Sequence, residues 1–120
     1  MLPAVHRLRS AAQFRATTRG GSKAARRSVV AYVLLPTTAE PAQSGAVAGL
    51  IVSRAVGGSV ARHRAARRLR SSVADILPGL PSGTSVVLRA LPGAAEDPEL
   101  PAQVVGAIDQ AARHAGGSSR

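Results

Sequence analysis

Short apolar runs alternate with amphipathic stretches along the chain and predict both strands and helices. Three runs rich in β-branched residues have the length and composition of strands. Two other stretches repeat apolar residues at helical spacing, and a third is bounded by helix-capping residues. We expect strands at residues 28–35, 47–53 and 84–90, and helices at residues 11–20, 59–77 and 100–115. This order is typical of a single-domain α+β fold, an α–β sandwich whose small sheet carries an N-terminal, a central arginine-rich and a C-terminal helix.

Capping residues predict where the first two helices begin and end. Ser10 followed by Gln13 fits the capping-box pattern, so the first helix should begin there. It should end near Gly20-Gly21, where glycine permits a left-handed C-cap. Gly57-Gly58 break the second strand, and Ser59 is the expected N-cap of the central helix.

The connecting segments are polar and flexible in composition. A basic loop from Lys23 to Arg27 should lead into the first strand, and a flexible connection should span residues 36–44. Pro101 marks the first turn of the last helix. We expect one domain over residues 1–115 and a disordered tail at residues 116–120.

The central helix carries its charge on one face. Five arginines fall between residues 62 and 70 with no acid among them. On a helical wheel the apolar side contains Ala65, Leu69, Val73 and Ile76, whereas Arg64, Arg67 and Arg68 lie opposite, His63 lies at the edge and Arg62 lies towards the apolar side. Guanidinium groups match phosphate geometry, and a dense row of them repels itself unless a polyanion neutralises it. The alternative is a solvated helix face, but such faces usually carry both signs of charge.

The net charge points to the same class of partner. The chain has 16 basic and 6 acidic side chains among its 120 residues, a net charge of +10. Residues 1–74 hold 13 of the basic side chains and one acid, Glu40. A concentrated field of one sign attracts a polyanion, so nucleic acid is the expected ligand. A membrane surface would require larger apolar side chains opposite the charge than the alanines and few aliphatics found here.

The sequence excludes several kinds of site. There is no cysteine, hence no disulfide and no thiolate metal site. No apolar run reaches about 18 residues and no signal-peptide core is present, so we expect a cytoplasmic protein without membrane contact. The three histidines lack metal-ligand spacing, and Glu96, Asp97 and Glu99 stand near a helix start, where the helix dipole favours acids. We therefore expect no catalytic residue in this chain and no metal ion or cofactor bound by it.

Residues in and around the central helix resemble a known family. The segment Ala48–Gly57, followed by Val60–Arg64 and Arg67–Arg70, is similar to the central signature of the bacterial ribonuclease P protein component. The stretch Leu8–Gly20 resembles the N-terminal helix of that family, and Gly83–Ala95 resembles its third strand and following loop. The resemblance covers most of the chain in the right order and spacing.

This resemblance implies a protein subunit of ribonuclease P, an endoribonuclease that removes the 5′ leader from precursor tRNA. In that family the RNA subunit, with bound magnesium, performs the hydrolysis. The implied partners are therefore ribonuclease P RNA and precursor tRNA, and we expect no obligate protein partner. RNA contacts would come from Arg54, Arg62, His63, Arg64, Arg67, Arg68 and Arg70. A cleft between the first helix and the sheet would hold the leader, with contributions from Arg7, Arg9, Phe14 and Tyr32.

The chain departs from the family pattern in both implied surfaces. Gly58 and His63 replace asparagines, and Ala66 replaces a lysine. Thr18 stands where a second aromatic residue follows the first, and Leu50 replaces an aromatic residue of the second strand. Phosphate contacts tolerate such losses better than base stacking does. We therefore expect binding of the RNA subunit to be kept, and leader affinity to be weaker than in relatives with more aromatic residues.

The sequence leaves alternatives open. Phe14 could instead anchor the first helix to the sheet, and Tyr32 fits the core better than a ligand surface. For the whole protein, the main alternative is a non-catalytic basic RNA-binding module of the ribosomal or RNA-assembly type. A helix-turn-helix DNA-binding protein would require two adjacent helices, whereas strand-like segments flank the central helix.

Overall fold

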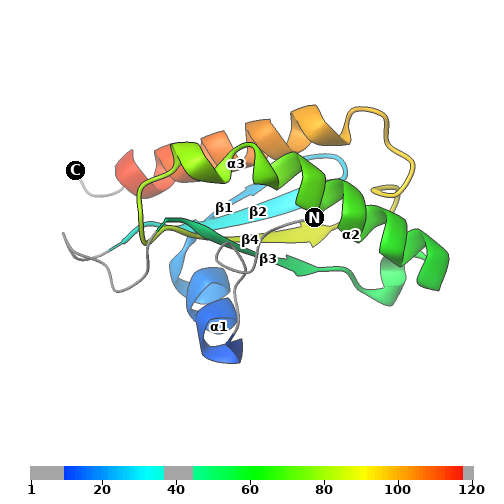
Figure 1. Ribbon diagram of the computed structural model, residues 1–120, viewed down its shortest axis with the longest axis horizontal. Helices are drawn as coiled ribbons and strands as arrows, with labels where there is room; N and C mark the ends of the chain where they lie inside the picture. Colours follow the sequence, from blue (N-terminus) through cyan, green and yellow to red (C-terminus); the bar gives the residue numbers. More distant parts are fainter. Residues whose placement is uncertain (1–9, 37–44, 118–120) are drawn as a thin grey trace.

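A four-stranded sheet in the spatial order β1-β2-β4-β3 forms the centre of the domain (Figure 1). The computed structural model describes residues 10–36 and 45–117. β2 pairs antiparallel with both β1 and β4, whereas β3 lies at the edge and runs parallel to β4. The strands are β1 (Ser22–Ala25), β2 (Val29–Leu34), β3 (Val47–Ile51) and β4 (Ser85–Ala90).

Helices cover the two faces of this sheet unequally. The helices are α1 (Ala11–Gly20), α2 (Ser59–Ala74) and α3 (Leu100–Gly117), and the 3-10 turns η2 (Arg54–Val56) and η3 (Leu77–Gly79) flank α2. α2 and α3 lie together on one face, and α1 lies on the other (Figure 1). The predicted α+β sandwich with three helices is confirmed. None of the helices in the described ranges has the length and apolar character needed to span a membrane.

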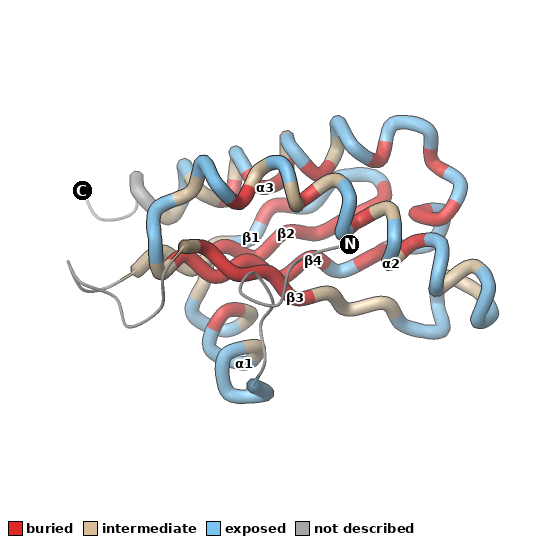
Figure 2. The backbone as a smooth tube through the Cα atoms, in the orientation of Figure 1, coloured by how far each residue is buried: buried red, intermediate tan, exposed pale blue. Residues whose placement is uncertain are grey.

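The larger core lies between the sheet and the pair α2 and α3. Alternate residues of β2 and β4 point into it and meet the inner sides of both helices, which Figure 2 shows as the buried stretches facing one another. Its largest fully buried side chains are Val29, Val33, Leu69, Val73, Leu77, Val86, Leu88, Leu100, Val104 and Ile108. The predicted apolar side of the central helix is confirmed, since Ala65, Leu69 and Val73 are buried.

A smaller apolar cluster occupies the opposite face of the sheet. Val30, Tyr32, Val47 and Val87 are buried there, and Phe14 of α1 packs against them. Because β2 and β4 are apolar on both faces, each forms a nearly continuous apolar run in the sequence. α1 covers only part of this face, and the rest of it carries half-buried and exposed side chains.

The segment predicted as a basic loop contains a strand instead. Ser22–Ala25 pair with residues 30–33 of β2, and the Arg26 N–H donates to the Val29 carbonyl (2.8 Å) to close the hairpin. The loop prediction was wrong because only Ala24 of this edge strand is buried, so four residues show no apolar alternation. Here the backbone of β2, rather than the local sequence, determines the strand.

Gly21 ends α1 for a different reason from the one predicted. The predicted start is confirmed, since the Gln13 N–H donates to the Ser10 Oγ (3.0 Å). Gly21 has φ −83°, however, so the predicted left-handed cap is wrong. A Cβ at Gly21 would lie 2.5 Å from the Thr17 carbonyl oxygen and 2.8 Å from that of Val33. Glycine is required here because α1 and β2 approach each other closely, not because φ is positive.

Gly58, not Ser59, is the N-cap of α2. Gly57 has a positive φ of 141° and turns the chain after η2, so Gly58 is already extended and Ser59 is the first helical residue.

β3 is also shorter than predicted: it ends at Ile51, and the Ser53 Oγ accepts from the Ala55 N–H (3.3 Å) at the start of η2.

The two ends of the chain and one connection are only partly covered. α3 extends to Gly117, two residues beyond the predicted end of the domain. Residues 1–9, 37–44 and 118–120 lie outside the described residues. These include the N-terminal arginines, most of the predicted flexible connection and most of the predicted tail.

Candidate RNA-binding surfaces

The exposed side of α2 carries a row of basic side chains, which we call the α2 row. His63, Arg64, Arg67 and Arg70 are all exposed, on the side of the helix away from its buried residues. The small side chain of Ala66 lies among them, and it lines a shallow hollow of about 370 Å³ together with His63, Arg67 and Arg70. Arg67 and Arg70 make the rim of this hollow cationic.

The α2 row has no acidic counterpart within the described ranges. The two ion pairs there join Arg27 to Asp97 and Arg113 to Asp109, and neither involves α2. α2 itself contains no acid, and Arg54 adds a further exposed cation in η2 just before the helix. Since no acid in the described ranges forms an ion pair with these groups, their donors are available there to an external polyanion.

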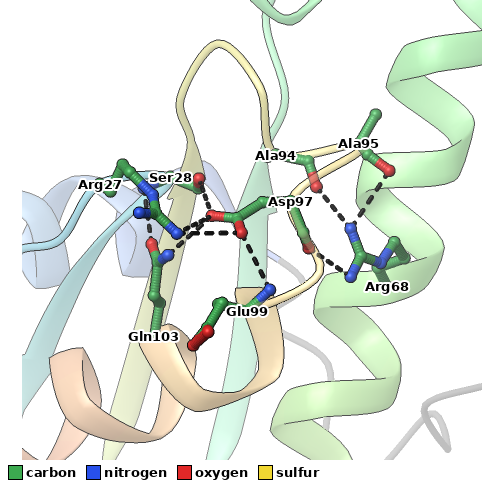
Figure 3. A network of polar contacts seen from close by, with 8 residues as sticks. All are labelled: Arg27, Ser28, Arg68, Ala94, Ala95, Asp97, Glu99 and Gln103. Atoms are coloured by element: carbon green, nitrogen blue, oxygen red, sulfur yellow. Dashed lines mark hydrogen bonds and ion pairs between the residues drawn. The ribbon is translucent and has the colours of Figure 1, made fainter.

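Arg68 does not belong to the α2 row. The helical wheel places it opposite the apolar side, but its guanidinium is half-buried and binds the loop before α3 (Figure 3). Its Nη1 donates to the carbonyls of Ala94 (3.0 Å) and Ala95 (3.2 Å), and its Nη2 donates to that of Asp97 (2.6 Å). The predicted position was wrong because a wheel shows one helix alone, whereas this loop reaches the flank of α2. Arg68 therefore joins α2 to the start of α3.

Arg62 lies at the boundary between the core and the α2 row, as its position on the wheel predicts. Its side chain is half-buried, and its Nε is fully buried without a hydrogen-bond partner among the described residues. A buried donor without a partner is costly, so Arg62 is held by packing rather than by a polar contact of this nitrogen.

The carboxylate of Asp97 ties the β1–β2 hairpin to the start of α3 (Figure 3). It accepts hydrogen bonds from the Ser28 hydroxyl, the Gln103 amide (2.7 Å), the Arg27 guanidinium (3.2 Å) and the Glu99 N–H (2.9 Å). The hydrogen bonds from Ser28 and Glu99, followed by Arg27, hold the pKa of Asp97 well below its usual range despite its burial. Asp97 thus lies just before α3, near the helix start where acids were expected, and accepts from a backbone N–H there.

The second predicted surface lies on the sheet face beside α1. Phe14 is half-buried and its ring lies against Gly49, where a Cβ would be only 2.2 Å from the Phe14 Cζ. Phe14 thus anchors α1 to the sheet and still presents part of its ring to solvent. Tyr32 is 9% exposed and belongs to the apolar cluster beneath. Arg7 and Arg9 lie outside the described residues.

Leu50 does not face this surface, so its placement among the aromatic positions of the cleft was wrong. It packs against the core under α2 and α3. Successive residues of a strand point to opposite faces, and it is Gly49 and Ile51 that face the α1 side. Thr18 lies one turn after Phe14 on α1, and its hydroxyl donates to the Phe14 carbonyl (3.0 Å).

One charged residue of this face, Arg89, is absent from the predicted site residues. It is exposed within β4, whose other residues are buried. The available signal was a single cation in an otherwise apolar strand, two residues after Val87, which lies on the same face of the sheet. In the described part of the chain, no three His, Asp or Glu side chains gather closely enough to share a metal ion.

An α+β domain with an exposed row of arginines that pairs with no acid of residues 10–36 and 45–117 has the features of the nucleic-acid-binding class. The sequence model of the family described as Ribonuclease P matches residues 2–112, which is most of the chain. The protein belongs to the ribonuclease P protein family, and the resemblance seen in its sequence is confirmed.

Individual relatives support this membership, and solved structures share the fold. The chain is 47% identical over 97 residues to the "Ribonuclease P protein component" of Rhodococcus opacus, covering 79% of this chain and 78% of the relative. The chain is also 43% identical over 114 residues to the "Ribonuclease P protein component" of Corynebacterium diphtheriae, covering 92% of this chain and 96% of the relative. The structure of the Staphylococcus aureus RNase P protein matches with a TM-score of 0.66 at 18% identity, covering 92% and 94% of the two chains. The structure of the RNase P protein from Thermotoga maritima matches with a TM-score of 0.67 at 16% identity, covering 87% of this chain and 96% of that one. Both structures show the shared fold.

The predicted function is confirmed at the level of the family. Ribonuclease P is an endoribonuclease and a ribonucleoprotein of tRNA processing, so this chain is a protein subunit that has an RNA partner in the holoenzyme. The alternative of a ribosomal or RNA-assembly module receives no support from these relatives.

Proposed function

We propose that the α2 row binds the RNA subunit of ribonuclease P and that the open sheet face beside α1 holds the 5′ leader of precursor tRNA. The observation that carries the first assignment is the exposure of Arg64, Arg67 and Arg70 without an acidic partner in the described ranges. His63 and Arg54 extend the same surface. The role of the row is electrostatic: it offsets the repulsion between two RNA molecules and positions the substrate.

The remaining arginines of α2 take different parts in this proposal. Arg68 contributes to the fold, because its guanidinium donors already bind three backbone carbonyls. Arg62 stands at the edge of the RNA-binding surface, half-buried and with its Nε enclosed by the protein.

The leader surface consists of the exposed part of Phe14 above a floor that includes Tyr32, with Arg7 and Arg9 supplied by the N-terminal segment. Bases of single-stranded nucleic acid stack on aromatic rings, whereas phosphates bind arginines. With one aromatic ring partly accessible, we propose weaker leader binding than in relatives with several such rings.

Hydrolysis in this proposal belongs to the RNA subunit, which supplies the magnesium-dependent chemistry. In this proposal the magnesium belongs to the RNA subunit and not to this chain. The protein therefore binds and orients RNA, and no bond-breaking step is assigned to its side chains. Action on precursor tRNA would place the protein in the cytoplasm.

The test is cleavage of precursor tRNA by a bacterial ribonuclease P RNA at limiting magnesium, with and without this protein. We expect the protein to restore correct 5′ processing under conditions in which the RNA alone is nearly inactive. The variant Arg64→Ala/Arg67→Ala/Arg70→Ala should lose this effect, while Arg113→Ala, which also removes an exposed arginine but on α3, should keep it. Salt-sensitive RNA binding without restored processing would instead favour the alternative function, a non-catalytic basic RNA-binding module.

A further inference from the structure

β4 carries a single exposed residue, and it is charged. Val86, Val87 and Leu88 are fully buried and Ala90 is 4% exposed, whereas Arg89 between them is exposed. A long cation in the middle of a buried strand is not required by the core, because the neighbouring positions on the same face are apolar.

The register of the sheet places Arg89 on the open face beside α1. It lies opposite Val30 of β2 and opposite Ile51 of β3, both of which belong to the apolar cluster of that face or pack against it. Directly paired residues project to the same side of a sheet. Arg89 therefore rises from the floor of the proposed leader surface, two residues along β4 from Val87, which pairs with the Gly49 that lies under Phe14.

The guanidinium of Arg89 lies beside an aromatic ring. Its Cζ is 6.0 Å from the centre of the Tyr32 ring, at the outer range of a cation–π contact. No hydrogen bond or ion pair joins its side chain to another described residue. Lys23, which pairs with Tyr32 from β1, adds a second exposed cation on the same face. The ring thus lies between two cations that no acid among the described residues neutralises.

We propose that Arg89 binds the single-stranded leader of precursor tRNA, with its guanidinium plane stacked on a base or its donors on a leader phosphate. This inference rests on the proposed function of the sheet face. An arginine plane offers a stacking surface as well as donors, so Arg89 supplies part of what an additional aromatic ring would supply. Lys23 supplies charge at the other side of Tyr32 but no flat surface.

The experiment compares two substrates with the reconstituted ribonucleoprotein. One is precursor tRNA with a leader of several nucleotides, and the other is the same tRNA with its leader removed. For Arg89→Ala we expect affinity for the first substrate to fall by about tenfold, as loss of one stacked base contact would produce. Affinity for the second should not change. Arg89→Lys should recover part of the loss, because it restores charge but not the plane.

Two controls keep this test interpretable. Arg89→Gln keeps most of the side-chain stem over Val30 and Ile51, and should match Arg89→Ala in binding while unfolding at the wild-type temperature. Arg113→Ala on α3 removes an exposed arginine elsewhere and should leave both affinities unchanged.

Each remaining outcome overturns one claim or both. Equal losses of affinity for the two substrates would assign Arg89 to the tRNA body or the RNA subunit and overturn the inference. An unchanged leader preference in Arg89→Ala and Arg89→Gln would also overturn it, while the leader surface itself would stand. A wild-type protein that shows no leader preference at all would overturn the leader surface and the inference together.

Discussion

The ring of Phe14 on α1 lies directly on the backbone of Gly49 in β3. A Cβ at Gly49 would be 2.2 Å from the Phe14 Cζ and 2.7 Å from its Cε1, distances that no real contact adopts. Gly49 has no positive φ, so its contribution is the absence of a side chain. This contact sets the position of α1 over the sheet and hence one wall of the proposed leader surface.

We predict that Gly49→Ala displaces the Phe14 ring and weakens the attachment of α1. The cost should be about 1–3 kcal/mol of unfolding free energy, the usual range for overpacking. Urea denaturation measures it. Gly79→Ala is the matched control, because a Cβ there meets nothing within 4 Å, and it should change stability little.

A double-mutant cycle separates this contact from a general effect on β3. If the methyl group acts only by displacing the ring, Gly49→Ala should cost little in a Phe14→Ala background. Additive costs in the double variant would show that the two residues do not act through their contact.

The α2 row should give RNA binding a strong dependence on salt. With about four or five phosphate contacts, log affinity for the RNA subunit should fall against log salt with a slope of roughly −3 to −5. Removing Arg64, Arg67 and Arg70 together should make the slope shallower by about 2–3 and leave the unfolding temperature close to wild type, since all three are exposed. A wild-type slope near zero would contradict the electrostatic account.

Arg68 should behave differently from its neighbour Arg67. Arg68→Ala leaves the carbonyls of Ala94, Ala95 and Asp97 without their donor and should cost on the order of 2 kcal/mol of unfolding free energy. Arg67→Ala should stay within about 0.5 kcal/mol of wild type, as exposed substitutions usually do. Chemical denaturation of both variants decides the matter, and equal stabilities would mean that the contacts of Arg68 contribute nothing net.

Features that depend on one segment could be predicted from the sequence. The apolar side of α2 follows from helical spacing, and the start of α1 follows from the pairing of Ser10 with Gln13. The three longer strands are visible because their residues are buried on at least one face. The arginine-rich signature of α2 was also enough to identify the family.

Features that depend on two segments could not be predicted in the same way. β1 exists because β2 pairs with it, and Arg68 faces away from solvent because a loop some 26 residues later reaches it. Leu50 was assigned to the wrong face because a one-residue difference in strand register reverses every side chain. Arg89 stands out in the sequence as a lone cation in an apolar strand, but only the register places it beside Tyr32.

The network around Asp97 should make the stability of the domain sensitive to acid. Its pKa is lowered in the folded state, so its carboxylate stabilises the fold above the unfolded-state value near 4, and this contribution is lost as the pH falls below that value. Asp97→Asn should therefore unfold at a lower temperature than wild type at pH 7, and the difference should shrink as the pH falls from about 4 towards 2.

The control for this pH dependence is Asp109→Asn, which removes an acid that is 61% exposed and pairs with Arg113 on the surface of α3. An exposed pair of this kind contributes little, so the difference between Asp109→Asn and wild type should be small at every pH. A constant difference between Asp97→Asn and wild type from pH 7 to pH 2 would mean that the hydrogen bonds of the side chain, rather than its charge, stabilise the junction of the β1–β2 hairpin with α3. A difference that closes in acid, by contrast, identifies the ionised carboxylate as the group that holds Arg27 and Ser28 at the start of α3.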